Sequence, residues 1–303
     1  MASPTSLPLP GIDPGATTTA PPGGLAPTGA VLAPRRRRPA LRPALWLVSL
    51  PLLVVAAWAL VPDWFTAYSP LDGVPSENFE APSASHPFGT DHLGRDVFSR
   101  VVFGTRQTLL TAGLAVLIGL VVGTLIGLVA ATAGRAADAT AMRLVDVLLA
   151  VPGFLISLVI VTAFAPGPVS LGVGVGIASI ASFARVVRSE VLRVRNLDYV
   201  EASFLNGGTY LSVVGRHILP NAAGPVLALL AVDLGAAILA ISGLGFLGFG
   251  APPPTPEWGL LIAEGRQYLG SAWWLTSLPG VVIVTTVILL AALGRQLLKT
   301  FRI

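Results

Sequence analysis

Six apolar segments constrain this sequence more than any other feature. They are residues 44–62, 109–131, 144–165, 169–184, 222–241 and 276–293. A bilayer core about 30 Å thick needs about 20 mostly apolar residues as a helix, because lipid offers no partner for open backbone groups. Only 11% of the 303 residues are charged, whereas a soluble domain carries about 25%. The sequence therefore predicts an all-α integral membrane protein with six transmembrane helices.

Two of these segments are weaker than the others. Residues 169–184 are short and rich in glycine, and residues 222–241 carry Asp233 near their middle. We expect neighbouring helices to shelter both segments from lipid. Three glycines recur on one helical face of the second segment: Gly119, Gly123 and Gly127. Such spacing allows another helix to approach closely, either within this chain or from another subunit.

The arginines predict the orientation. A run at Arg35–Arg38, followed by Arg42, precedes the first segment, and only four of the 19 basic residues fall outside the segments predicted to be cytoplasmic: Arg95, Arg100, Arg106 and Arg266. The positive-inside rule then places both termini in the cytoplasm of a multi-pass protein of the cell (inner or plasma) membrane. The predicted organisation is a disordered tail with the arginine cluster (1–43), a first helix (44–62), an external segment (63–106), a five-helix core (107–298) and a cytoplasmic C-terminus (299–303).

Several classes of chemistry are excluded by the residues. The chain has no cysteine, its three histidines lie far apart, and its sole lysine, Lys299, does not follow a glycine as a phosphate-binding loop requires. A GxGxxG at Gly243, Gly245 and Gly248 leads into prolines rather than a helix, so we interpret it as packing or a loop. With no hydrolase motif and basic residues placed by topology, we expect no catalytic residue, no bound metal or cofactor, and no nucleic-acid partner.

Residues 196–220 form a loop that is too patterned for a plain connector. Asp198 followed by Glu201 resembles a capping box and predicts a short helix, which the Asn-Gly-Gly run should end. Thr209 can begin a second helix that stops before Pro220. The loop also carries many apolar residues: Tyr199, Val200, Phe204, Leu205 and Tyr210. Exposed apolar patches mark interaction sites, so a partner protein is expected to bind here.

The spacing within this loop resembles the EAA loop of the membrane subunits of bacterial ABC importers. The matching residues are Glu201, Ala202, Ser203, Gly207, Ile218, Leu219 and Pro220. Ser203 departs from the family, which usually has a second alanine there, but serine is small enough to preserve packing.

Other stretches resemble the DppC/OppC-type subunits of dipeptide and oligopeptide permeases. They are residues 86–106, the segment from Met142 and the segment from Gly245, and the likeness covers roughly residues 44–298. Two positions depart from it: Ile241, where relatives often carry glutamate, and Arg295, where they often carry aspartate.

The resemblance implies a type I ABC importer permease fold and a subunit that is not itself an enzyme. It implies four kinds of partner: a second homologous permease, two ABC ATPases that use the ATP, an extracytoplasmic solute-binding protein and the lipid bilayer. Residues 196–220, here called the coupling loop, would dock into the ATPase, with Glu201 making polar contacts, Ala202 and Ser203 keeping the helix flush, and Gly207 holding the bend.

The translocation path is less defined by the sequence. Asp233 and Asn221 are the first candidates, followed by the external loop around Trp258 and Glu264. Asp146 is expected to pair with Arg143 on the same helical face. Two alternatives remain open: a secondary transporter or channel that works without an ATPase, and the same ABC fold importing nickel or another non-peptide solute.

Overall fold

The computed structural model of the chain describes residues 43–301. Residues 1–42, with the arginine run and nearly all of the predicted tail, lie outside the described part, as do residues 302–303 at the predicted C-terminus. Within residues 43–301 the regular elements are helices, and one isolated bridge joins Thr90 and Asp96.

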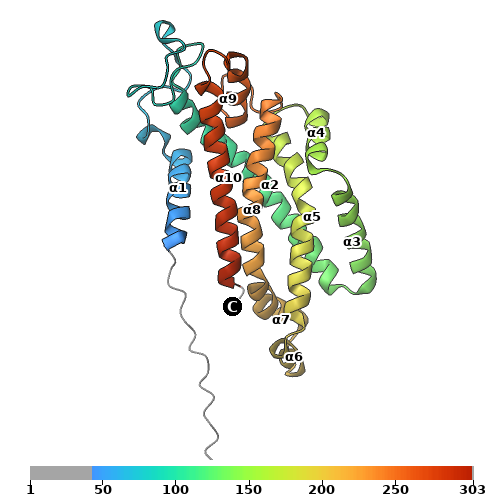
Figure 1. Ribbon diagram of the computed structural model, residues 1–303. Coiled ribbons are helices and arrows are strands. Elements are labelled where there is room, and N and C mark those ends of the chain that lie inside the picture. The colour runs from blue at the N-terminus through green and yellow to red at the C-terminus, as the bar shows by residue number, and fades with distance from the viewer. Residues whose placement is uncertain (1–42, 302–303) are drawn as a thin grey trace, which may run out of the picture. The chain divides into compact units, whose positions relative to one another are not determined.

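Four long helices form the body of the structure (Figure 1): α2 (Val97–Thr132), α5 (Pro168–Arg195), α8 (Leu219–Phe246) and α10 (Trp274–Phe301). Each is long and apolar enough to cross a membrane. The shorter α1 (Pro43–Leu60) packs against α2 and α10. The predicted all-α membrane fold is confirmed, and each of the six predicted segments contains helix.

A close contact between α2 and α5 explains the regularly spaced glycines. A Cβ atom added at Gly123 would lie 2.7 Å from the backbone oxygen of Ile180, and one added at Gly127 would lie 2.5 Å from that of Ala184. Gly119 meets the side chain of Ser179 in the same way. These glycines therefore pack within the chain, which resolves the two alternatives left by their spacing.

The predicted span 144–165 is not one continuous helix. It is divided between α3 (Arg135–Ala150) and α4 (Gly153–Phe164), whose axes are bent by 85°. Val151 is extended, with φ −96° and ψ 128°, because the ring of Pro152 disfavours a helical residue before it. Pro152 also lacks the N–H group that would continue the helical ladder.

The predicted short span 169–184 is part of a longer helix. α5 runs for 28 residues to Arg195, beyond the apolar segment. Its glycines are used in helix contacts, since Gly172 lies against Leu114 and Gly174 against Ser157. The glycine content thus reflects close neighbours on two sides rather than a weak helix.

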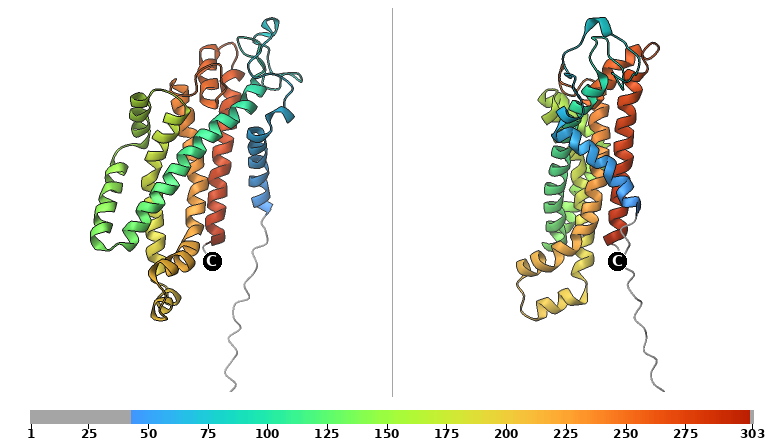
Figure 2. Two further views of the ribbon diagram at one scale, coloured as in Figure 1. Left: turned by 180° about the vertical axis from the view of Figure 1, so that it is seen from behind. Right: turned by 90° about the vertical axis from the view of Figure 1, so that its left-hand side faces the viewer.

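One end of the bundle carries a folded cap, made of residues 61–96 and 247–273. The cap contains the short α9 (Trp258–Gly265) and three single turns: Pro62–Trp64, Pro75–Glu77 and Arg266–Tyr268. Its apolar centre is formed by Ala272 together with Val97 at the start of α2 and Trp274 and Leu275 at the start of α10. Figure 2 shows the cap at the end opposite α6 (Asp198–Leu205) and α7 (Tyr210–Val213), here called the loop end.

Candidate functional site

The coupling loop projects beyond the ends of α5 and α8 (Figure 1) and begins with the helix α6. Its first turn is closed by the backbone N–H groups of Val200 and Glu201, which donate to the carbonyl oxygen of Leu197. Glu201 and Ala202 are exposed, and the Ser203 hydroxyl donates to the Tyr199 carbonyl oxygen at 2.8 Å. Two of the three EAA-like positions therefore face outward from the bundle.

Gly207 ends α6 with a sharp turn. Its φ is +83°, a left-handed conformation that glycine adopts without steric cost. The Gly208 N–H donates to the carbonyl oxygen of Ser203 at 3.1 Å, as in a Schellman motif. The space beside the Gly207 Cα is open, so the backbone conformation is what requires glycine at this position.

The second helix of the loop does not stop before Pro220, so that part of the sequence prediction is wrong. α7 passes into a π-turn, Val214–Ile218, and then directly into α8 at Leu219. The Leu219 N–H donates to the Val214 carbonyl oxygen, one residue further back than in an α-helix. Pro220 lies in the first turn of α8, where a missing N–H group is tolerated, and the wider turn directly precedes it.

The loop rests on the bundle through an apolar contact, here called the valine seat. It consists of Val200, Val213, Val214 and Ile218 from the loop with Val191 and Val194 of α5, Ala131 of α2 and Ala222 of α8. Val200 is thus buried, against the expectation that it is exposed, whereas Leu205 is 82% exposed. The side chains of Phe204 and Tyr210 lie outside the described part. Of the EAA-like residues near α8, Ile218 is buried while Leu219 and Pro220 are exposed.

The two predicted path residues do not lie together. Asn221 is in the first turn of α8, exposed, with its Nδ2 donating to the His217 carbonyl oxygen at 2.7 Å. Asp233 lies 12 residues further along α8, about 18 Å at 1.5 Å per residue. Its Oδ2 is buried with no hydrogen-bond partner among the described residues, and the Ser179 hydroxyl of α5 lies beside the carboxyl group.

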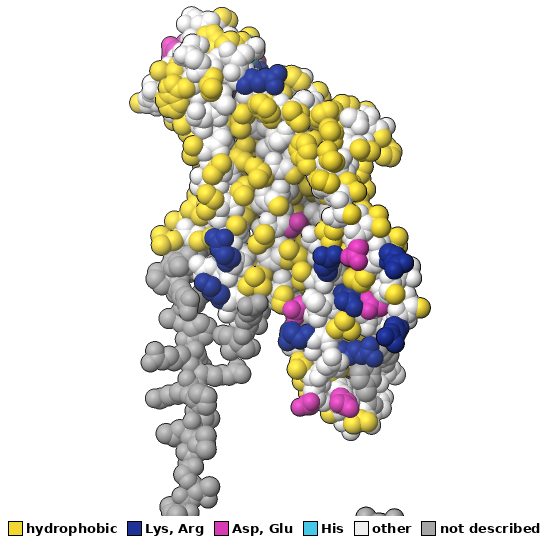
Figure 3. Space-filling view, turned by 45° about the vertical axis from the view of Figure 1, so that its right-hand side comes forward, with side chains coloured by type: hydrophobic (Ala, Val, Ile, Leu, Met, Phe, Trp, Pro, Cys, Tyr) yellow, Lys and Arg dark blue, Asp and Glu magenta, His cyan; other side chains and the backbone are white. Residues whose placement is uncertain are grey.

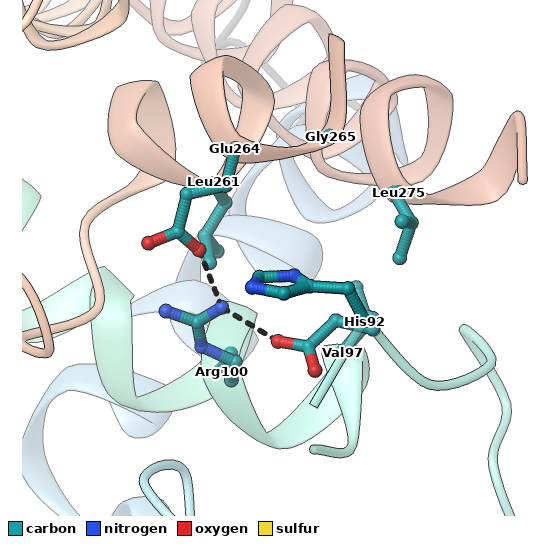
Figure 4. Close-up of a pocket in the computed structure, with 8 residues that line it drawn as sticks. His92, Val97, Arg100, Leu261, Glu264, Gly265 and Leu275 are labelled. Carbon is teal, nitrogen blue, oxygen red and sulfur yellow. Dashed lines mark hydrogen bonds and ion pairs between the residues drawn. The ribbon is translucent and has the colours of Figure 1, made fainter. Parts of the chain in front are cut away.

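A buried ion-pair cluster in the cap was not found by sequence reasoning. Arg100 Nη1 lies 2.9 Å from Asp91 Oδ2 and 2.7 Å from Glu264 Oε2, and Arg95 Nε lies 2.7 Å from Asp91 Oδ2. Figure 4 shows the Arg100 guanidinium between Glu264 of α9 and the carboxylate that precedes His92. The cluster joins the segment before α2 to α9, 164 residues away in sequence, and no local pattern signals such a pair.

Glu257 and Trp258 hold α9 in place, and neither faces an open path. The Glu257 carboxylate caps α9 by accepting from the N–H groups of Gly259 at 2.9 Å and Leu260 at 3.2 Å. Burial raises the pKa of Glu257 to about 7, against the lowering effect of these two hydrogen bonds. The Trp258 indole is fully buried and donates to the Val101 carbonyl oxygen at 3.1 Å.

Asp146 pairs with Arg185 of α5 at 2.7 Å rather than with Arg143. The neighbouring Asp138 likewise pairs with Arg188 of α5 at 2.5 Å. These contacts tie α3 to α5 at the loop end, because acids spaced along α3 meet arginines spaced along α5. The prediction failed because a helix spacing of three residues does not exclude a partner on an adjacent helix.

The chain matches known membrane transport proteins. Residues 123–301 match the family described as "Binding-protein-dependent transport system inner membrane component". The "Di/tripeptide transport system permease protein DppC" of Pseudomonas aeruginosa is 36% identical over 80% of this chain and 82% of that protein. The "Glutathione transport system permease protein GsiD" of Pectobacterium atrosepticum is 36% identical over 82% of each chain.

The fold is shared with a solved ABC transporter. A chain in the inward-facing structures of the MetNI methionine ABC transporter matches with a TM-score of 0.55 and 20% identity, over 67% of this chain and 97% of that chain. At this identity the likeness establishes the fold alone, an ABC importer permease fold. This chain therefore belongs to the family of inner membrane components of binding-protein-dependent transport systems, as a membrane-spanning permease subunit.

Proposed function

We propose that this chain forms, with a second homologous permease, the translocation path of an ABC importer for di- or oligopeptides or similar small solutes. Solute would come from an extracytoplasmic binding protein, and two ABC ATPases bound at the coupling loop would use the ATP, with none bound by this chain. The names of the relatives, which refer to di/tripeptides and glutathione, support this solute class.

The observation that carries the proposal is the construction of the coupling loop. Gly207 fixes a sharp turn and the valine seat buries the inner side of the loop, while Glu201, Ala202 and Leu205 remain exposed on the outer side. A loop held this way transmits a displacement to α2, α5 and α8, whereas an unpacked loop would absorb it. Glu201 and Ala202 lie on the surface that an ATPase would contact in this proposal.

The proposed orientation places the loop end and both termini in the cytoplasm. Figure 3 shows hydrophobic side chains across the upper and middle parts of one face and most of its Lys and Arg side chains toward the loop end. Cytoplasmic segments of membrane proteins carry an excess of these residues. The cap would then lie outside, where a binding protein delivers solute.

The test is ATP-driven uptake of dialanine in vesicles that contain the assembled importer. We expect uptake to require ATP and the Gly207→Val variant to lose it, because a β-branched residue disfavours the left-handed turn. The matched control is Gly215→Val, since Gly215 lies in the π-turn with open space beside it. Normal uptake by Gly207→Val would contradict the role assigned to the turn.

The same vesicles separate the alternatives. Uptake by this chain alone, without ATPases or ATP, would identify a secondary transporter or channel instead. ATP-driven uptake of nickel, with no uptake of peptides, would retain the ABC mechanism and replace the solute class.

A further inference from the structure

Asp233 is the one charged residue in the central part of the four long helices within residues 43–301. The charged residues of α2 are Arg100 and Arg106 near its start, and those of α5 begin at Arg185 in its last three turns. α10 carries its charges from Arg295 onward. A carboxylate at the centre of a membrane helix costs about 2.5 to 3.5 kcal/mol, so an ionised Asp233 needs a compensating ligand or a water-filled path.

The described part of the chain does not supply that ligand. No Lys, Arg or His nitrogen of the described residues lies within 4.0 Å of the Asp233 carboxylate. Its Oδ2 is buried without a hydrogen-bond partner, although the side chain as a whole is partly exposed. Among the described residues the carboxylate therefore has no cationic partner, while the residue is accessible from one face of the helix.

The surroundings of Asp233 suit a small donor group. Val232 and Gly235 contact α10, where Val232 lies against Gly294 and Gly235 against Val287, so Asp233 points away from α10. On the other side the Ser179 hydroxyl of α5 lies beside the carboxyl group. The partly exposed Asp233 carboxylate and the Ser179 hydroxyl offer oxygen acceptors to an ammonium group, which has three N–H donors.

We propose that Asp233, with Ser179, binds the ammonium group of the transported solute within the membrane. This inference rests on the proposed function and deepens it, because it assigns to this chain a site for the free amino terminus of a peptide. The binding protein would select the solute first, and Asp233 would then favour solutes that carry a positive group at that end. The competing source of the missing charge is a cation on the second permease.

The first experiment labels the assembled importer, without ATP, with a hydrophobic carbodiimide, which modifies buried carboxyl groups, and maps the product by mass spectrometry. We expect Asp233 to be labelled in the empty assembly and dialanine, at about nine times its Kd, to slow labelling by about tenfold. N-acetyl-dialanine, which lacks the ammonium group, should give no protection. Ser179→Ala should weaken the protection by dialanine.

The second experiment measures ATP-driven uptake of dialanine by the Asp233→Asn variant. We expect uptake to fall by about tenfold or more, which corresponds to about 1.4 kcal/mol or more, while assembly with the ATPases is unchanged. Asp146→Asn is the matched control, since Asp146 is an exposed acid at the loop end.

The outcomes separate this inference from the proposed function. The ammonium site is overturned if both peptides protect Asp233 equally or if neither protects it. It is also overturned if Asp233 is not labelled in the empty assembly, a result that would point to a cation from the second permease. If the wild-type importer takes up dialanine and the Asp233→Asn variant does so equally well, the ammonium site is overturned and the proposed function stays intact. Absence of any ATP-driven solute uptake by the wild type would instead contradict the proposed function.

Discussion

The two ends of the bundle are held by different forces. The coupling loop is fixed by apolar burial in the valine seat and by one left-handed turn at Gly207, and its outer side chains are exposed. The cap is fixed by buried charges: Arg100 pairs with the nearby Asp91 and also with Glu264 of α9, which is distant in sequence. Apolar contacts hold a surface in place without specifying a partner for each atom, whereas buried ion pairs require every member. The cap should therefore be the more sensitive end to a single polar change.

The largest effect is expected at Arg100. Its side chain is 2% exposed and pairs with two carboxylates, so Arg100→Met would leave Glu264 with only a 3.6 Å contact to Arg95 and Asp91 with Arg95 alone. Removing one member of a buried pair costs about 3 to 5 kcal/mol. Thermal unfolding in detergent and limited proteolysis of the cap measure the loss, with the exposed Arg106→Met as control. Equal stability of the two variants would contradict the importance of the cluster.

Glu257 should make the stability of the cap depend on pH. Because burial raises its pKa to about 7, the folded protein keeps a proton that the unfolded chain releases at an ordinary pKa of about 4.3. Stability should therefore fall as pH rises from about 4 to 7, by about 3 kcal/mol over the whole window.

The Glu257→Gln variant tests this pH dependence, because an amide does not titrate while its oxygen still accepts a hydrogen bond from the start of α9. Thermal midpoints between pH 4 and pH 8 should fall more steeply in the wild type than in the variant. Identical slopes in the two proteins would exclude Glu257 as the titrating group.

A smaller effect is expected in the valine seat. Val213 is 2% exposed, and Val213→Ala would remove two buried carbon groups, worth about 1.6 kcal/mol at 0.8 kcal/mol each. The exposed Leu205→Ala should change unfolding free energy by less than about 0.5 kcal/mol. If uptake falls in Leu205→Ala while stability does not, Leu205 acts in ATPase contact rather than in folding.

The smallest effect, and the sharpest contrast, compares two glycines of the loop. Gly207→Ala should destabilise by about 1 kcal/mol, because an L-residue pays for the left-handed conformation, although a Cβ atom there meets no neighbour. Gly215→Ala should stabilise by about as much, since Gly215 lies in helical backbone with open space. Unfolding midpoints that shift in the same direction would contradict the assignment of the turn.

The coupling loop and the cap also differ in how much of them could be predicted from the sequence. The coupling loop depends on local signals, so a helix starting near Asp198 and a turn at Gly207 could be predicted, whereas the predicted helix end before Pro220 was wrong. The cap depends on the pairing of Glu264 with Arg100, and at the loop end Asp146 pairs with Arg185 rather than with Arg143. Those choices are made by packing between helices, which a linear pattern does not contain.

The continuation of the loop into α8 and the break after α3 show the limits of proline as a signal. Pro152 ends a helix because the residue before it becomes extended, whereas Pro220 is accommodated by the π-turn that precedes it. The two prolines carry the same restriction, and the backbone on their N-terminal side decides the result.

The glycine face of α2 has a mechanical consequence. No side chains separate α2 and α5 at Gly123 and Gly127. The two helices cannot slide past one another without collision of their backbones, so we expect them to move as a rigid pair. The coupling loop packs against Ala131 near the end of α2 and against Val191 and Val194 near the end of α5. A displacement of the coupling loop should therefore move both membrane helices together, with little bending of either helix.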